Sequence, residues 1–87
     1  MKIINYFVEF VSTVLFSYIV LTAQNVFIIA AVFTLIIFLN GSTMFMNPAI
    51  TIMMYSVHKI PITDVIPFCL AQVTGALLGL EINNYFR

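Results

Sequence analysis

Charged residues are the scarcest feature of this sequence. Three Lys or Arg and three Asp or Glu make up 7% of its 87 residues, whereas 63% are hydrophobic. A soluble domain carries charge on about a quarter of its residues, so this chain lacks the charge to cover itself in water. The near-zero net charge also gives no basis for binding nucleic acid or an anionic surface. We therefore expect a multi-pass integral membrane protein whose main partner is the lipid bilayer.

Metal-binding and catalytic groups are equally sparse. A single cysteine, Cys69, excludes an internal disulfide and a cysteine-based metal site, and a single histidine, His58, excludes a histidine cluster. The sequence contains no nucleophile–base pair, carboxylate pair or phosphate-binding loop. Thioethers alone suit copper(I), but adaptable packing is the simpler interpretation of the methionines, which are Met44, Met46, Met53 and Met54. We expect no enzyme activity, no metal and no cofactor.

Four apolar segments divide the chain, and we interpret them as one domain over residues 1–87. Helices are expected over about 6–23, 26–40 and 64–84. The first and last are near the ~20 residues that cross a membrane, whereas the second is short for a crossing and is expected to use flanking residues or to tilt little. The stretch 41–57 is expected to be an irregular loop and a half-helix rising about 15 Å, half of the hydrocarbon core. The fold class is therefore an all-α membrane protein with three transmembrane helices and one re-entrant half-helix. Lys2 and the following apolar run look like a cleavable signal, but Glu9 interrupts the run and further apolar segments follow.

The half-helix is expected to begin at Asn47-Pro48-Ala49. Asn is a good N-cap, and Pro is favoured at the first helical position because it has no amide to leave unpaired. Non-helical chain at membrane depth, here 41–46, is tolerated only beside protein or a watery cavity. The positive end of the helix dipole at Asn47 would then disfavour cations at mid-membrane. Ala49 is small enough for a second half-helix to dock end to end.

Two polar side chains lie inside apolar segments. A carboxylate within a membrane helix is unfavourable by a few kcal/mol, so we expect Glu9 to accept hydrogen bonds from the amides of the irregular loop. Gln72 is expected to bind the same loop from the other side. The alternative for Glu9 is a membrane-edge residue that reaches outward to water. Gly75 and Gly79 have the small-xxx-small spacing that lets two helices approach closely in lipid.

Three motifs in order resemble aquaporins and glycerol facilitators, the major intrinsic protein family. Residues 9–13 (EFVST), 47–51 (NPAIT) and 71–76 (AQVTGA) are similar to the motifs of the family's first helix, half-helix and third helix. The resemblance covers nearly the whole chain and corresponds to one of the two inverted repeats, the first more closely than the second. It implies three helices and a re-entrant half-helix, with two Asn-Pro-Ala ends meeting at mid-membrane. It also implies that Glu9 and Gln72 brace the loop.

The chain departs from the family at the pore. Phe27 has the spacing from Asn47 of the aromatic that narrows the outer mouth of water channels, although plain packing is its alternative role. The second repeat of the family carries an arginine after its Asn-Pro-Ala, where this chain has Ile50. The family usually has Ser-Gly-Ala-His-Leu before Asn-Pro-Ala, whereas residues 42–46 here are STMFM, so the glycine and the histidine are lost and bulky Met and Phe are gained. The resemblance then implies a more apolar constriction that suits water or glycerol, or else a closed assembly.

The expected function is a passive channel for water or small uncharged solutes, with the pore assembled from two or more chains. Three crossings place the termini on opposite sides, and the Lys/Arg bias between the sides is slight. The second half is then either another copy in the opposite orientation, forming an antiparallel dimer, or a separate half-channel chain. The alternatives are a non-conducting structural membrane protein derived from the same fold, and a truncated gene product.

Overall fold

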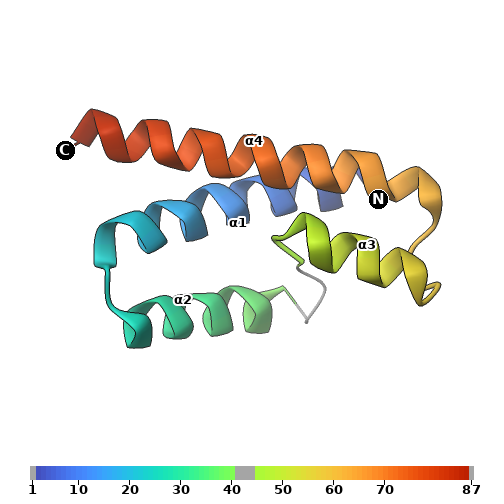
Figure 1. Cartoon of the computed structure of the whole chain (residues 1–87), viewed down its shortest axis with the longest axis horizontal. Helices are drawn as coiled ribbons and strands as arrows, with labels where there is room; N and C mark the ends of the chain where they lie inside the picture. Colours follow the sequence, from blue (N-terminus) through green and yellow to red (C-terminus); the bar gives the residue numbers. More distant parts are fainter. Residues whose placement is uncertain (1, 41–44, 87) are drawn as a thin grey trace.

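A computed structural model describes residues 2–40 and 45–86, which form four α-helices (Figure 1). In chain order these are α1 (Lys2–Ala23), α2 (Val26–Leu39), α3 (Pro48–Ser56) and α4 (Ile62–Phe86). The described part of the chain is therefore all-helical. Its first and last helices are longer than the apolar runs alone predicted. The first four residues of the expected irregular loop, 41–44, lie outside the described residues.

Helices α1 and α4 lie side by side and run in the same direction (Figure 1). At one end, the hydroxyl of Tyr6 donates a hydrogen bond of 2.7 Å to Asp64 Oδ1. At the other end, the hydroxyl of Thr22 donates to Asn83 Oδ1 over 3.2 Å. The two polar pairs fix the register of the helices, and the parallel course places the N- and C-termini at opposite ends of the molecule.

Gly75 and Gly79 allow the close approach of α4 to α1. A Cβ atom at Gly75 would lie 2.9 Å from the carbonyl oxygen of Phe10, and one at Gly79 would lie 2.8 Å from that of Val14. Both distances are shorter than real Cβ atoms tolerate. The small-xxx-small spacing therefore acts within the chain, where it brings two helix backbones together.

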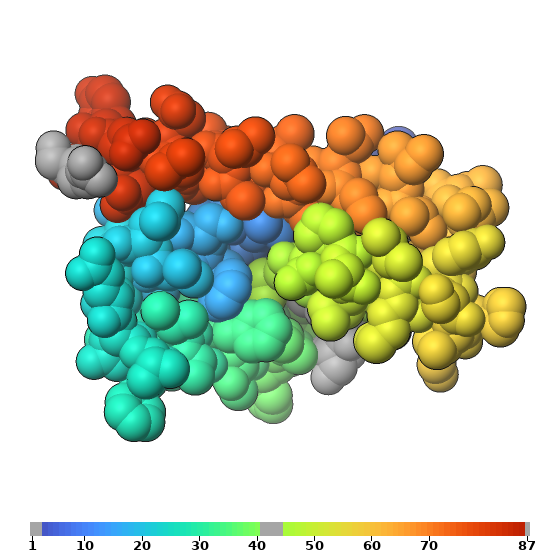
Figure 2. Space-filling view, in the orientation of Figure 1, coloured from blue at the N-terminus to red at the C-terminus, as the bar shows by residue number. Residues whose placement is uncertain are grey.

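The two shorter helices follow one another along the length of the α1–α4 pair. Helix α2 packs on α1 and α3 packs on α4, and Figure 2 shows them side by side below α4. The ring of Phe33 in α2 lies 5.1 Å from that of Phe16 in α1. Helix α2 has 14 residues and rises only about 21 Å. By length and composition, α1 from Ile3 and α4 are the described helices that suffice to cross a membrane.

The polarity of the molecule is inverted relative to a soluble domain, in which charged side chains are almost never fully buried unless paired. Among the described residues, more of the buried side chains are polar than apolar, and most of the large apolar side chains are exposed. Phe27, Phe38 and Val26 on α2 are each more than 70% exposed, as are Tyr85 and Phe86 at the end of α4. A contiguous apolar exterior of this kind marks contact with lipid or with other protein. The buried polar and charged residues are Glu9, Ser12, Thr13, Thr51, Asp64 and Gln72.

Candidate functional site

The N-terminus of α3 lies near the middle of the long axis of the molecule (Figure 1). Asn47 is its N-cap in extended conformation, and Pro48 occupies the first helical position. The side-chain oxygen of Asn47 accepts a hydrogen bond of 2.7 Å from the amide of Ala49. Among the described residues, the side-chain NH₂ group of Asn47 has no partner, and the residue is exposed. A free donor group therefore stands at the positive end of the helix dipole.

Glu9 of α1 holds the backbone that leads into α3. Its carboxylate accepts hydrogen bonds from the amide of Phe45, at 3.1 Å to Oε1, and from the amide of Met46. Met46 has a φ of 55°, a left-handed conformation that non-glycine residues adopt only where their surroundings stabilise it. Glu9 is 1% exposed and Met46 is 8% exposed. The buried carboxylate is thus directed at the strained residue immediately before the N-cap.

Gln72 of α4 and Thr51 of α3 continue this network. One hydrogen of Gln72 Nε2 is donated to Glu9 Oε1 over 3.0 Å, and the other to the hydroxyl of Thr51 over 2.7 Å. That hydroxyl in turn donates to the carbonyl oxygen of Asn47 at 3.1 Å. Each donor has an acceptor, and no buried side-chain polar atom of the described residues is left unpaired. The network joins α1, α3 and α4 around the start of α3. Because its hydrogen-bonding groups all have partners, it makes this buried polar core rigid.

The structure brings Glu9, Gln72 and Asn47 together, with one difference from expectation. Gln72 was expected to bind the loop amides, but among the described residues it binds the Glu9 carboxylate and Thr51. Thr51, which is completely buried, was not expected to be part of the site. The sequence could have indicated this role. Thr51 lies four residues after the N-cap, and a threonine hydroxyl in a helix can donate to the carbonyl oxygen four residues earlier.

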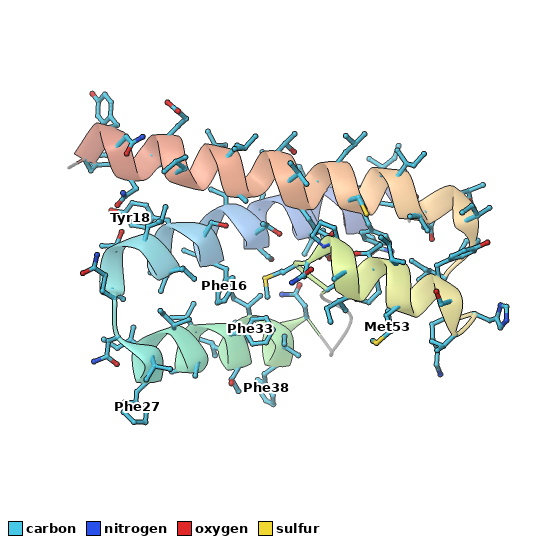
Figure 3. All side chains as sticks on the ribbon, in the orientation of Figure 1. Phe16, Tyr18, Phe27, Phe33, Phe38 and Met53 are labelled. Carbon is cyan, nitrogen blue, oxygen red and sulfur yellow. The ribbon has the colours of Figure 1, made fainter. Side chains whose placement is uncertain are left out.

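Phe27 and Ile50 lie away from this network. Phe27 is 81% exposed in the first turn of α2, and Figure 3 shows its ring pointing away from α1 and α4. Within one chain its ring therefore lies apart from the groove that ends at Asn47, and its role at the outer mouth of a pore stays a prediction. Ile50 is 39% exposed on α3. Both side chains are free to contact lipid or another chain.

An open groove runs along α1 and α4 and ends at the start of α3. Its polar lining is concentrated near Asn47 and includes Thr13 and Gln72, whereas residues such as Leu21, Leu77 and Leu80 make the remainder apolar. Met46 borders the groove. The ring of Phe45 instead packs against that of Phe68, at 5.3 Å. Gln72 and Thr13 are buried and already donate within the chain, so the groove offers the free donor group of Asn47 at one end and an apolar wall along the rest.

No family model, curated protein or solved structure matches this chain. The resemblance to aquaporins therefore stays a prediction from the three sequence motifs. The geometry of the hydrogen-bonded network and of the groove is independent of that resemblance.

Proposed function

We propose that this chain is one half of a passive membrane channel for water or small uncharged solutes. In this proposal α1, α2 and α4 lie across the bilayer, and α3 is a re-entrant half-helix. The observation that carries the proposal is the position of the α3 N-terminus. It lies near the middle of the long axis, it is held there by the buried Glu9–Gln72–Thr51 network, and its Asn47 amide opens onto the groove.

Placement in a membrane is supported by the inverted polarity of the molecule. The large apolar side chains face outward, and the buried network is polar. In hydrocarbon no water satisfies backbone or carboxylate groups, so an internal partner for each of them is required. The internal hydrogen bonds of Glu9 and the loop amides of Phe45 and Met46 meet that requirement.

A second chain is needed because one chain forms only one wall of a pore. Helix α3 has nine residues and rises about 14 Å, which is half of a hydrocarbon core. The groove at its N-terminus is open along its length. A second half-helix that enters from the opposite side, in an inverted copy or in a different half-channel chain, would meet Ala49 and cover the groove.

The lining supports an uncharged solute. The positive end of the α3 dipole disfavours cations at the level of Asn47, and the apolar remainder of the groove gives an anion no partners. The Asn47 amide donates one hydrogen bond to a passing oxygen. With Ile50 at the position of the family's arginine, no additional positive charge is placed beside that amide.

Osmotic shrinkage of vesicles tests this function. Vesicles that contain the chain are expected to release water or glycerol faster than empty vesicles in stopped-flow light scattering. In the Asn47→Asp variant an aspartate caps α3 equally well, but it has no NH₂ donor and adds a carboxylate at membrane depth, which is unfavourable by a few kcal/mol. Since the lost hydrogen bond alone is worth about 1 kcal/mol, flux should fall by at least about fivefold.

The matched control for this variant is Asn25→Asp. Asn25 caps α2 in the same way, with its side-chain oxygen accepting from the amides of Phe27 and Ile28, but it lies at the end of the molecule. Its flux should equal that of the unmodified chain. Folded protein with the flux of empty vesicles would contradict a pore made by this chain alone and would favour a non-conducting structural role or a missing partner chain.

A further inference from the structure

We propose that a cavity beside Glu9 binds an organic zwitterion of the phosphoethanolamine type, with a primary ammonium at one end and an anionic group at the other. The cavity has a volume of about 530 Å³ and lies between the N-terminal half of α1, the end of α3 and the start of α4. It shares no lining residue with the groove that ends at Asn47. The inference is therefore independent of conduction through that groove.

The carboxylate of Glu9 is buried without a countercharge. It is 1% exposed, and its partners in the described part of the chain are two backbone amides and the side-chain amide of Gln72. The described basic side chains, His58 and Lys59, form no ion pair with it. Charged groups in protein interiors are normally paired with an opposite charge, and the α3 dipole supplies only part of one. A cation in the adjacent cavity would complete the compensation.

The hydrogen bonds of Glu9 are shared unevenly between its two oxygens. Oε1 accepts from the amides of Phe45 and Met46 and from Gln72, whereas Oε2 has only a long contact of 3.4 Å from the amide of Phe45. A carboxylate has about four lone-pair sites, so Oε2 retains capacity for a further donor. Because Glu9 lines the cavity, a primary ammonium, which carries several N–H donors, suits this oxygen.

The rest of the lining suits an organic cation rather than a metal ion. No group of three or more His, Cys, Asp or Glu side chains in the described part of the chain could hold a metal. The rings of Phe45 and Phe68, whose centroids lie 5.3 Å apart, form an apolar wall together with Ile60. Such a wall can pack against the methylene groups that join the two charged ends of the ligand.

Lys59 supplies the opposite charge at the mouth of the cavity. Its side chain lines the cavity and is exposed, and it has no ion-pair partner among the described residues. The carboxylates of the lining, Glu9 and Asp64, are both buried. A ligand with its ammonium toward the buried carboxylates and its anionic group at Lys59 would match both charges. The headgroup of an ethanolamine phospholipid and free phosphoethanolamine present the same chemistry.

A lipid titration tests this inference. The full chain in dodecyl maltoside micelles is mixed with equal mole fractions of dioleoyl-phosphatidylethanolamine, -phosphatidylcholine or -phosphatidylglycerol, or with phosphoethanolamine alone, and its helical circular dichroism is followed on heating. The ethanolamine lipid should raise the melting temperature by about 5 °C or more. The choline lipid has no N–H on its cation and the glycerol lipid has no cation, so both should raise it less.

The response to phosphoethanolamine identifies the source of the ligand. A rise with the free zwitterion supports a site that recognises the headgroup alone, and a rise with the ethanolamine lipid only supports a lipid ligand. Equal shifts from the three lipids, or no shift from either ethanolamine compound, would overturn the inference.

Matched tryptophan variants separate the cavity from a general effect of the lipid. Ile60→Trp places a larger side chain in the cavity wall and should abolish the ethanolamine-specific shift. Ile66→Trp makes the same change at a position that is 68% exposed and outside the lining, and should keep it. Glu9→Gln removes the charge but keeps an acceptor oxygen, and should also lose the shift, measured against the same variant without lipid. Equal shifts in Ile60→Trp and Ile66→Trp would contradict binding in this cavity.

Discussion

The Glu9→Ala variant is expected to lose about 4 kcal/mol of unfolding free energy, the range for removing one partner from a buried charged network. Its carboxylate accepts from the amides of Phe45 and Met46 and from Gln72 Nε2. Alanine leaves these buried or half-buried donors without their acceptor, and each unpaired buried group costs about 1–3 kcal/mol. Met46 also loses the contact that stabilises its left-handed backbone.

Unfolding by sodium dodecyl sulfate in mixed micelles, followed by far-ultraviolet circular dichroism, measures this loss. The control is Glu81→Ala, which removes a glutamate that is exposed on α4 and should leave the transition unchanged. A Glu9→Ala transition that coincides with the control would contradict a structural role for the carboxylate. It would favour the alternative that Glu9 reaches outward at the membrane edge.

The Gly79→Val variant is expected to destabilise the chain by about 3 kcal/mol, at the upper end of the range for overpacking. A Cβ atom at this position would lie 2.8 Å from the carbonyl oxygen of Val14 and 2.9 Å from Ser17 Cβ. The nearest atoms belong to the backbone and to a short side chain, so they cannot rotate away. The helices must separate, which also strains the Thr22–Asn83 hydrogen bond near the same end.

The same unfolding measurement applies to this variant, with Leu78→Val as its control. Leu78 is 42% exposed on the same helix, whereas Gly79 is buried, so the control places a β-branched residue at an adjacent and more exposed position. It should unfold close to the unmodified chain. Equal transitions for the two variants would show that α1 and α4 do not approach closely at Gly79.

The local features of the fold could be predicted from the sequence. The apolar runs indicate where the helices lie, and Asn47-Pro48 indicates the start of α3 because capping depends on neighbouring residues alone. The proximity of Glu9 and Gln72 could be expected because two buried polar groups in apolar helices need partners. The left-handed backbone of Met46 has no local signal, because methionine has no preference for that conformation.

The orientation of α2 could not be predicted from spacing along the chain. Phe27 and Ile36 are nine positions apart, which places them on opposite sides of an α-helix at about 100° per residue. Ile36 is buried with Met46 against α1, so Phe27 faces outward. This orientation of α2 depends on packing between Phe16 and Phe33, which is a contact between distant parts of the sequence. The spacing of Phe27 from Asn47 along the chain carries no information about it.

Disulfide cross-linking at Ala49 tests the half-channel assembly most directly. Ala49 is exposed beside the N-cap of α3, and in the proposed half-channel it lies where two half-helices meet. In a Cys69→Ser background, the reconstituted Ala49→Cys variant is predicted to form a covalent dimer under mild oxidation, and Phe27→Cys, on the outer face of α2, to form little. Dimers through position 27 with none through position 49 would contradict the account, because the chains would then associate by their outer surfaces and enclose no pore.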